Sequence, residues 1–267
     1  MRAVGSTPAG YRPEVGCGRN PLDAFEIERM AQLESTHWWF RGRRALLVDI
    51  LRERCERLGE TTPRLLDLGS GTGANAVAFC VLGKVVAMEP AVAALRYARA
   101  RRGPRYVRGE GTRLPFAAQS FHAVIASDVL EHIADDTAVV REVARVLGPQ
   151  GVFVFTVPAR EELWSGHDEA LGHHRRYRPE TIRRLLEDAG LRVGWLTYWN
   201  SALFPIAALR RLADRRLRPG RHSSDVGHAG VLATRALVLL LRLESLVARK
   251  VGLPMGLSLV GWAEPMR

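Results

Sequence analysis

Lysine is nearly absent from this sequence of 267 residues. Only Lys84 and Lys250 occur among its 39 Lys and Arg residues, so all the others are arginine. An arginine bias of this kind is typical of GC-rich coding sequence and says little about phosphate contacts. The formal net charge of +11 creates a long-range field that attracts anions. The charge by itself therefore does not indicate a nucleic-acid or membrane ligand.

Cysteine and long apolar runs are also scarce. Cys17, Cys55 and Cys80 are too few and too scattered for a disulfide framework or a Cys-rich zinc site, which favours a cytoplasmic protein. No uninterrupted apolar run reaches the length of about 18 residues that a membrane-spanning helix requires. Residues 1–20 contain Gly and Pro but no apolar core, so we expect a flexible N-terminus and no signal peptide.

The middle of the chain, residues 63–200, alternates short apolar runs with helical patterns. Five runs are expected to be strands: Arg64–Leu68, Val85–Met88, Tyr106–Val107, Ala123–Ala126 and Val152–Val157. The helices expected between them are Asn75–Leu82, Ala91–Arg101 and Asp136–Leu147. Strands that alternate with helices pair in parallel through right-handed crossovers. The sequence therefore predicts an α/β fold whose open, mostly parallel sheet is sandwiched by helices.

Helical patterns flank this core on both sides. Residues 21–62 are expected to form an N-terminal lid of two helices, Leu22–Leu33 and Gly42–Leu58, joined by an aromatic loop. After the polar loop Pro158–Tyr177, a helix from Pro179 to Gly190 and a strand Leu191–Tyr198 are expected. Residues 201–256 should be a helical insert before the final strand. The insert comprises two helices, Ser201–Leu217 and Val231–Lys250, with the polar stretch 218–230 between them. The last segment, 257–267, contains the final strand Leu257–Ala263.

The second helix of the insert carries Arg235, Arg242 and Arg249 at intervals of seven residues. Such spacing places the three arginines along one face of a helix. We expect this face in solvent and the leucine-rich remainder packed on the domain. Contact with a second copy, or with an anionic membrane surface, remains an alternative.

A glycine-rich segment, Asp67-Leu-Gly-Ser-Gly-Thr-Gly73, follows the first expected strand. Glycines permit close approach of the backbone to a ligand, and a strand–helix junction is where nucleotide-like ligands bind in open α/β sheets. The spacing of Gly69, Gly71 and Ala74 also fits a dinucleotide-binding loop. Asp67 favours a different ligand, because a carboxylate repels a pyrophosphate but attracts sulfonium and ammonium groups.

Two acidic residues extend this pattern. Glu89 ends the second expected strand, 20 residues after Gly69, where an acid can accept hydrogen bonds from both hydroxyls of a ribose. Glu110 follows the third strand, placed to accept from an adenine amino group, and Gly111 offers a backbone N–H there. Together these residues predict a site for S-adenosylmethionine, which carries an adenosine and a sulfonium.

In their order along the chain, these residues resemble the class I S-adenosylmethionine-dependent methyltransferases, and within them the ubiquinone/menaquinone-type enzymes that act on small molecules. The resemblance covers residues 63–158 and also rests on Leu114-Pro115-Phe116, Phe121, Ser127-Asp-Val-Leu-Glu-His132 and Leu147-Gly-Pro-Gln-Gly151. It implies a Rossmann-like, seven-stranded sheet whose last strand is antiparallel. It also implies S-adenosylmethionine as the cofactor and S-adenosylhomocysteine as the product.

The resemblance implies a set of cofactor-binding residues as well. The set comprises Asp67, Gly69, Ser70, Gly71, Gly73, Glu89, Pro90, Glu110, Gly111, Thr112, Ser127, Asp128, Val129 and His132. The family usually has Asp at the place of Glu110. His132 borders the methionyl end of the cofactor in related enzymes, and a structural role at the entrance of a helix is its alternative.

The aromatic segment His37-Trp38-Trp39-Phe40-Arg41 is the first candidate for the substrate side. It could form a lid that gives the reacting methyl group apolar walls and excludes water. Alternatively, the rings could simply anchor the N-terminal helices on the sheet. Arg41 or Arg44 could pair with a carboxylate of the cofactor or with an anionic substrate.

The loop after the fifth expected strand is the second candidate. His167 and His173 are the candidate bases for the methyl acceptor, and Trp164 and Tyr177 are candidate substrate-side residues. Histidines that only hydrogen-bond the loop together are the alternative. We predict no metal ligands here, although Asp168 lies among the histidines, because zinc sites usually show closer paired spacing or cysteines.

The sequence therefore predicts a cytoplasmic, monomeric or homodimeric methyltransferase that acts on an oxygen, nitrogen or carbon of a small molecule, such as a secondary metabolite or a lipid-like acceptor. Two alternatives stay open: cyclisation or elimination driven by the same sulfonium, and methylation of RNA. Enzymes that methylate exocyclic base amines usually carry Asn/Asp-Pro-Pro-aromatic where this chain has Ser127-Asp128-Val129-Leu130. No cysteine follows the fourth or fifth strand to attack a cytosine C5 position, so nucleic acid is disfavoured.

Overall fold

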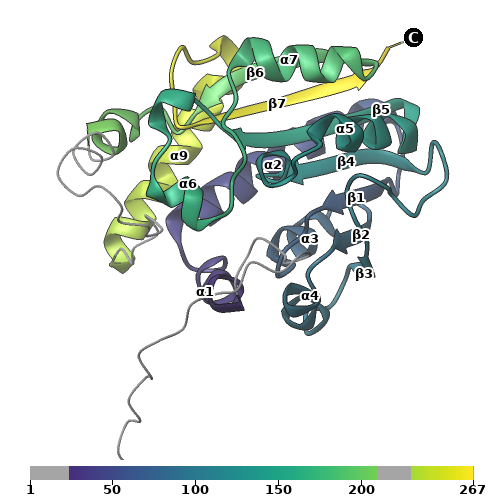
Figure 1. Ribbon diagram of the computed structural model, residues 1–267, viewed down its shortest axis with the longest axis horizontal. Coiled ribbons are helices and arrows are strands. Elements are labelled where there is room, and N and C mark those ends of the chain that lie inside the picture. Colours follow the sequence, from purple (N-terminus) through teal and green to yellow (C-terminus); the bar gives the residue numbers. More distant parts are fainter. Residues whose placement is uncertain (1–23, 210–229, 267) are drawn as a thin grey trace, which may run out of the picture.

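A seven-stranded sheet runs through the centre of the computed structural model, which describes residues 24–209 and 230–266 (Figure 1). Its strands are β1 (Arg64–Leu68), β2 (Lys84–Glu89), β3 (Arg105–Arg108), β4 (Phe121–Ser127), β5 (Leu147–Pro158), β6 (Leu191–Trp199) and β7 (Ser258–Pro265). They lie in the order β3-β2-β1-β4-β5-β7-β6. Neighbouring strands are parallel except at β7, which is antiparallel to β5 and β6. The predicted fold class is confirmed.

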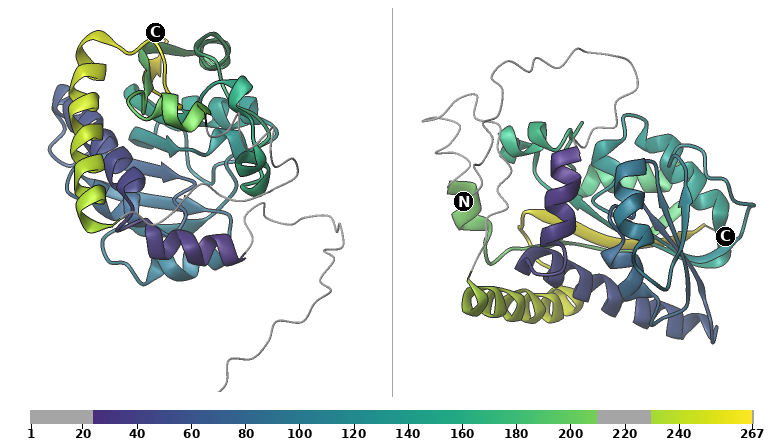
Figure 2. Two further views of the ribbon diagram at one scale, coloured as in Figure 1. Left: turned by 90° about the vertical axis from the view of Figure 1, so that its left-hand side faces the viewer. Right: turned by 90° about the horizontal axis from the view of Figure 1, so that it is seen from below.

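Helices cover both faces of this sheet (Figure 2). They are α1 (Ala24–Leu33), α2 (Trp38–Leu58), α3 (Ala74–Phe79), α4 (Val92–Arg99), α5 (Asp136–Val146), α6 (Gly166–Ala170), α7 (Pro179–Asp188) and α9 (Val231–Val251). On one face α5 and α7 bury residues such as Val143 and Leu186. On the other, α2, α3 and α9 bury Leu47, Phe79 and Leu241. Helices such as α5 and α7 repeat apolar residues every three or four positions, so one side of each faces the sheet.

The aromatic segment does not form the loop that we expected. Helix α2 begins at Trp38, ahead of the predicted Gly42, so Trp38, Trp39 and Phe40 occupy its first turn. His37 is the N-cap, and its Nδ1 accepts a hydrogen bond from the Trp39 backbone N–H at 3.3 Å. A side-chain acceptor at this position satisfies a backbone donor that has no partner inside the helix. A histidine side chain therefore caps α2, where Ser or Asp is more usual. We did not predict this N-cap from the sequence.

Strand β5 and the loop after it also differ from the predictions. Strand β5 begins at Leu147, before the expected Val152, because Leu147 pairs with Phe121 and a register irregularity follows in β4. The loop Pro158–Tyr177 contains the 3-10 helix η2 (Glu161–Leu163) and the short helix α6, neither of which we predicted. A capping box between Ser165 and Asp168 starts α6.

Helix α9 packs differently from the expectation. Arg235 and Arg242 are exposed as predicted, but Arg249 donates to Glu53 of α2 at 2.7 Å. The buried face includes Glu244, whose carboxylate accepts from the backbone N–H groups of Ser201 and Ala202 at 2.8 and 2.9 Å. Several apolar side chains of this helix face outward instead, among them Leu232, Leu239, Leu243, Leu246 and Val247.

Some expectations lie outside the described residues. They concern the segment 1–20, which we expected to be flexible, residues 218–229 of the expected polar stretch, and residues 210–217 of the expected helix Ser201–Leu217. The described part of that helix is helical over residues 204–209. Within the described ranges, no helix is long and apolar enough to cross a membrane.

Candidate cofactor and substrate site

A cavity of about 640 Å³ opens beside the carboxyl ends of β1, β2 and β4. Open α/β sheets bind their ligands at this edge, and the volume falls in the range of about 300–1,000 Å³ that is usual for ligand pockets. The walls come from the loop after β1, the end of β2, the 3-10 helix η1 (Leu130–His132), and α1, α2 and α9.

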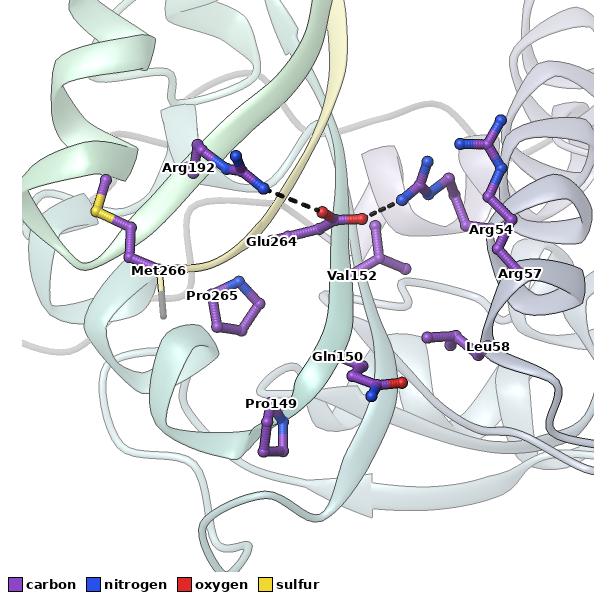
Figure 3. Close-up of a pocket in the computed structure, with 10 residues that line it drawn as sticks. All are labelled: Arg54, Arg57, Leu58, Pro149, Gln150, Val152, Arg192, Glu264, Pro265 and Met266. Atoms are coloured by element: carbon purple, nitrogen blue, oxygen red, sulfur yellow. Dashed lines mark hydrogen bonds and ion pairs between the residues drawn. The ribbon is translucent and has the colours of Figure 1, made fainter.

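A second hollow, of about 760 Å³, lies at the opposite edge, where β5 begins and β7 ends (Figure 3). Its charges are matched within the protein. Glu264 pairs with Arg54 and lies 3.9 Å from Arg192, while Arg57 donates to Glu53 at 2.8 Å. This hollow gathers no histidine, cysteine or hydroxyl nucleophile, so we assign the chemistry to the first cavity.

Glycine is required at two positions of the loop between β1 and α3. Gly69 and Gly71 have φ angles of 67° and 55°, which residues with a side chain rarely adopt. A Cβ at Gly69 would come within 2.6 Å of Val129 Cγ2, and one at Gly71 within 3.0 Å of Met30 Cε. The backbone of this loop therefore borders the cavity directly, beneath α1 and η1.

Glu89 is held rigidly at the end of β2. Its Oε2 accepts from the Gly71 backbone N–H at 2.9 Å, and its Oε1 accepts from that of Ala91 at 3.0 Å. Burial raises the pKa of Glu89, and these two hydrogen bonds oppose the rise. Each carboxylate oxygen keeps further acceptor capacity for a ligand in the cavity. This geometry suits the predicted contact with a ribose diol.

Glu89→Ala is expected to weaken S-adenosylmethionine binding by about 1.5–3 kcal/mol, the range for hydrogen bonds to a charged group. Isothermal titration calorimetry gives this number directly. Glu187→Ala, an exposed acid on α7, should bind the cofactor as the unmodified protein does. If Glu89→Ala loses only a few tenths of a kcal/mol, the ribose contact is wrong.

An ion pair that the sequence did not reveal closes the cavity beside β4. Asp128 has a φ of 54°, accepts from Thr156 Oγ1 at 2.8 Å and pairs with Arg43 of α2. The Arg43 guanidinium lies 4.2 Å from the centre of the Trp39 ring. Burial lowers the pKa of Arg43 to about 9. Arg43 is one of six arginines in α2, and only its position on the helix distinguishes it from the others.

Buried polar atoms along the cavity and behind it fit a polar ligand. Within the described residues, Asp67 Oδ2, Ser70 Oγ, Thr72 Oγ1 and Ser127 Oγ have no hydrogen-bond partner. Buried polar groups nearly always have one, so these atoms suit the predicted cofactor. Burial raises the pKa of Asp67 to about 8, although Arg43 opposes the rise. Asp67 is 1% exposed and lies behind the wall, so its side chain does not border the cavity directly.

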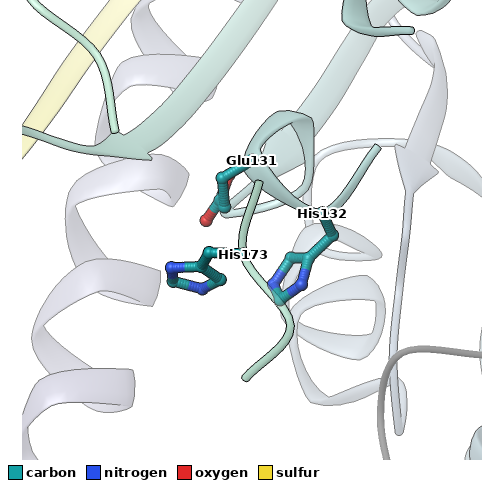
Figure 4. Close-up of side chains that lie close together, drawn as sticks. All are labelled: Glu131, His132 and His173. Atoms are coloured by element: carbon teal, nitrogen blue, oxygen red, sulfur yellow. The ribbon is translucent and has the colours of Figure 1, made fainter. Parts of the chain in front are cut away.

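Glu131, His132 and His173 come together on the cavity wall (Figure 4). One donor atom from each lies within 4.8 Å of the others, and the two imidazole rings are 4.6 Å apart. Both carboxylate oxygens of Glu131 and Nδ1 of His132 are buried without a partner among the described residues. Burial raises the pKa of Glu131 to about 8 and lowers that of His132 to about 3. Our sequence reading considered His132 and missed Glu131, although the two are adjacent.

A buried carboxylate orients His173. Asp168 Oδ1 lies 2.9 Å from His173 Nδ1, and Arg176 donates to both oxygens of Asp168 at 2.8 and 3.0 Å. Since the carboxylate accepts, this network assigns the proton to Nδ1 and leaves a lone pair on Nε2. Burial alone would raise the pKa of Asp168, but His173 and Arg176 outweigh it and hold this pKa well below its usual range.

Asp168→Ala is expected to destabilise the fold by about 3–5 kcal/mol, because it leaves the Arg176 charge buried without its partner. Denaturant unfolding at pH 7 measures the loss, and Asp188→Ala, an exposed acid, is the matched control. The folded-state pKa of Asp168 is depressed, so its contribution is complete above the unfolded pKa of about 3.9 and is lost as the pH falls. The difference between the two variants should therefore shrink below about pH 4. Equal stability of both variants at pH 7 would contradict this role.

Apolar side chains form the remaining wall. Trp38, Trp39 and Phe40 line the cavity together with His37, as do Leu203, Ile206 and Leu237 from the segment before β7. The predicted cofactor residues on the wall are Gly69, Ser70, Gly71, Glu89, Pro90, Glu110, Gly111, Ser127, Asp128, Val129 and His132, and both predicted bases, His167 and His173, line it too. One cavity thus brings together residues that lie far apart in the sequence.

Several predicted residues lie off the wall. Gly73 caps α3, and Thr112 and Arg41 are exposed. Trp164 donates from Nε1 to Glu169 at 3.3 Å. Tyr177 is 1% exposed and its hydroxyl donates to Asp136 at 2.7 Å. Arg44, in contrast, lines the cavity but donates to Asn75 and to the Glu34 carbonyl. Arg41, Trp164 and Tyr177 do not line the cavity, so their expected substrate-side roles stay predictions.

A mostly parallel sheet in this strand order, with a glycine loop after β1 and an acid at the end of β2, defines a Rossmann-like methyltransferase fold. Residues 66–155 match the family model described as a methyltransferase domain, which agrees with the predicted resemblance to the class I S-adenosylmethionine-dependent methyltransferases. The cofactor of this family is S-adenosylmethionine, as predicted.

Individual relatives agree with this assignment. The chain is 38% identical over 125 residues to a demethylmenaquinone methyltransferase of Mycobacterium sp. strain KMS, covering 45% of this chain and 54% of the relative. It is 31% identical over 163 residues to a Mycobacterium tuberculosis protein named "Probable S-adenosylmethionine-dependent methyltransferase", covering 59% and 57%. The chain thus spans about half the length of the curated relatives it matches.

A solved structure shows the same fold. It is a complex between the Haloferax volcanii Trm112 methyltransferase activator and a methyltransferase, with a TM-score of 0.56 and 20% identity. The match covers 91% of this chain and 94% of the other.

Proposed function

We propose that this protein transfers a methyl group from S-adenosylmethionine to a small molecule. The cavity carries the proposal, because it joins a glycine loop and the fixed carboxylate of Glu89 to a separate polar wall at Glu131, His132 and His173. The first part suits the cofactor, and the second part suits the acceptor. A cytoplasmic location belongs to the same proposal.

S-adenosylmethionine supplies an electrophilic methyl group on a cationic sulfonium. In this proposal Gly69 and Gly71 let the cofactor approach the backbone, Glu89 accepts from its ribose, and Glu110 accepts from its adenine. Trp38 and Trp39 of α2, with Leu203 and Leu237 of the described part of the insert, exclude water from the reacting atoms. The proton of the acceptor leaves on the side of His173, whose Nε2 lone pair Asp168 orients.

The walls favour an acceptor with an apolar body and one ionisable group. Trp38, Trp39 and Leu203 offer apolar surface, while the histidines and Glu131 are concentrated on one side. A hydroxyl on an aromatic or lipid-like body fits this division, and a mycobacterial relative is named for demethylmenaquinone. Monomer and homodimer are both compatible with this site, because every residue that it uses comes from one chain.

Incubation with methyl-labelled S-adenosylmethionine and a panel of phenols, quinols and hydroxylated lipids tests the proposal. We expect labelled product together with S-adenosylhomocysteine. Release of methylthioadenosine, or an isomerised acceptor without label, would support cyclisation or elimination chemistry instead. Labelling of tRNA but of no small molecule would support the RNA alternative.

A further inference from the structure

The Glu131, His132 and His173 cluster has the donor set of a metal centre. It provides one carboxylate and two imidazoles, and these donors are concentrated where the cavity wall is buried: Glu131 is 0% exposed. Two histidines and a carboxylate that leave further positions open are a common arrangement for Zn²⁺ and for other divalent transition metals. The residues come from η1 and from the loop after α6, so the chain folds to bring them together.

The hydrogen bonds around both imidazoles are compatible with metal binding. In metal centres, the ring nitrogen that does not bind the metal donates to a carboxylate or a backbone carbonyl. His173 Nδ1 lies against the buried Asp168, which leaves Nε2 toward the cluster. His132 is hydrogen-bonded to the backbone of Leu171, and its Nδ1 has no partner among the described residues. Each ring thus has one nitrogen fixed and the other available.

The buried carboxylate of Glu131 independently indicates a bound cation. Both of its carboxylate oxygens are buried, and no other described residue donates a hydrogen bond to them. The nearby guanidinium groups of Arg43 and Arg176 form ion pairs with Asp128 and Asp168 and favour the charged form of Glu131 through their own charges. A buried carboxylate without a donor is costly, and a cation at this point removes the cost.

We propose that Glu131, His132 and His173 bind one divalent transition-metal ion, such as Zn²⁺, beside the acceptor. The donors lie within 4.8 Å of one another and need to close by about 1 Å around an ion with bonds of about 2.1 Å. From the sequence we predicted no metal in the loop of His167 and His173, because zinc sites usually show closer paired spacing or cysteines, and we did not consider Glu131.

The proposed metal site rests on the proposed methyl transfer, and it indicates that the methyl acceptor is an oxygen nucleophile. A cation beside the acceptor lowers the pKa of a hydroxyl. The hydroxyl loses its proton to solvent, its oxygen forms a bond to the methyl carbon, and the carbon–sulfur bond breaks with its electron pair on sulfur. The products are the methyl ether, neutral S-adenosylhomocysteine and one proton.

The metal site can be tested by titrating the chelator-treated protein with Co²⁺. The visible absorption of bound Co²⁺ reports binding, and competition with Zn²⁺ reports the affinity for zinc. We expect one equivalent of Co²⁺ to bind in a low-symmetry site. Glu131→Gln and His132→Gln should weaken binding by more than the roughly 10–100-fold typical for loss of a residue in the outer shell. His174→Gln, an exposed neighbour off the cavity wall, should bind as the unmodified protein does.

A second measurement keeps the test independent of the variants. Zn²⁺ should raise the melting temperature of the unmodified protein, and S-adenosylmethionine should raise that of the chelated protein as well. No bound Co²⁺ and no Zn²⁺ shift, or equal Co²⁺ affinity in all variants, would overturn the metal site. A cofactor shift without metal binding leaves methyl transfer standing, whereas metal binding without any cofactor shift contradicts the proposed function alone.

Discussion

Gly71→Leu is expected to abolish measurable binding of S-adenosylmethionine. A side chain at φ 55° is strained, its Cβ would already lie 3.0 Å from Met30 Cε, and the remaining leucine atoms would fill the approach to the loop. The Gly71 N–H also fixes Glu89 at 2.9 Å. The substitution therefore acts on the loop and on the ribose contact at once. Isothermal titration calorimetry measures the loss.

Gly190→Leu is the matched control for this experiment. Gly190 has a φ of 83°, follows α7, and its Cβ would meet no atom within 4 Å. It imposes similar backbone strain away from the cavity, so cofactor affinity should not change. Circular dichroism checks that both variants fold. Normal cofactor affinity in folded Gly71→Leu would mean that the glycine loop is only a turn.

His173→Gln is expected to lower turnover by about 10²–10⁴-fold, the usual contribution of a positioned acid–base group. The substitution removes the Nε2 lone pair from the acceptor side, whether that lone pair takes a proton or holds a cation. S-adenosylmethionine affinity should stay the same, because Glu89 and the glycine loop lie elsewhere on the wall. Single-turnover rates and cofactor titration together separate the two effects.

Comparison with His174→Gln decides whether the loss at His173 is specific. His174 is exposed and lies off the cavity wall, so its replacement should leave turnover unchanged. A turnover in His173→Gln within a few-fold of the unmodified protein would show that acceptor activation needs another group, and His167, which also lines the cavity, is the next candidate.

The strands and the cofactor loop could be predicted because local signals define them. β1 coincides with its predicted range, and the glycines at 69 and 71 have the positive φ angles that their residue type indicates. Buried parallel strands read as continuous apolar runs, so the alternation predicted a mostly parallel sheet, and the resemblance added that its last strand is antiparallel. The glycine loop and Glu89 were identified from sequence because their spacing is fixed by a single strand–loop–helix unit.

The acceptor side was less predictable because tertiary contacts define it. Arg43 reaches Asp128 across 85 positions of the chain, and His173 lies beside His132 only after the loop with α6 folds back. Neither pairing has a local signature. Helix α9 shows the same limit, since Glu244 is buried to cap Ser201 and Ala202 while several leucines are exposed. Hydrophobic periodicity alone predicts the opposite orientation.

The most direct test of the central claim is the thermal shift produced by S-adenosylmethionine and S-adenosylhomocysteine. A ligand at a concentration of about 100 Kd stabilises the folded state by about 2.7 kcal/mol. For a domain of about this size the melting temperature should rise by about 5–10 °C, and Glu89→Ala should show a smaller rise. NADH at the same concentration should produce no shift. A shift with NADH and none with either S-adenosyl compound would contradict the account.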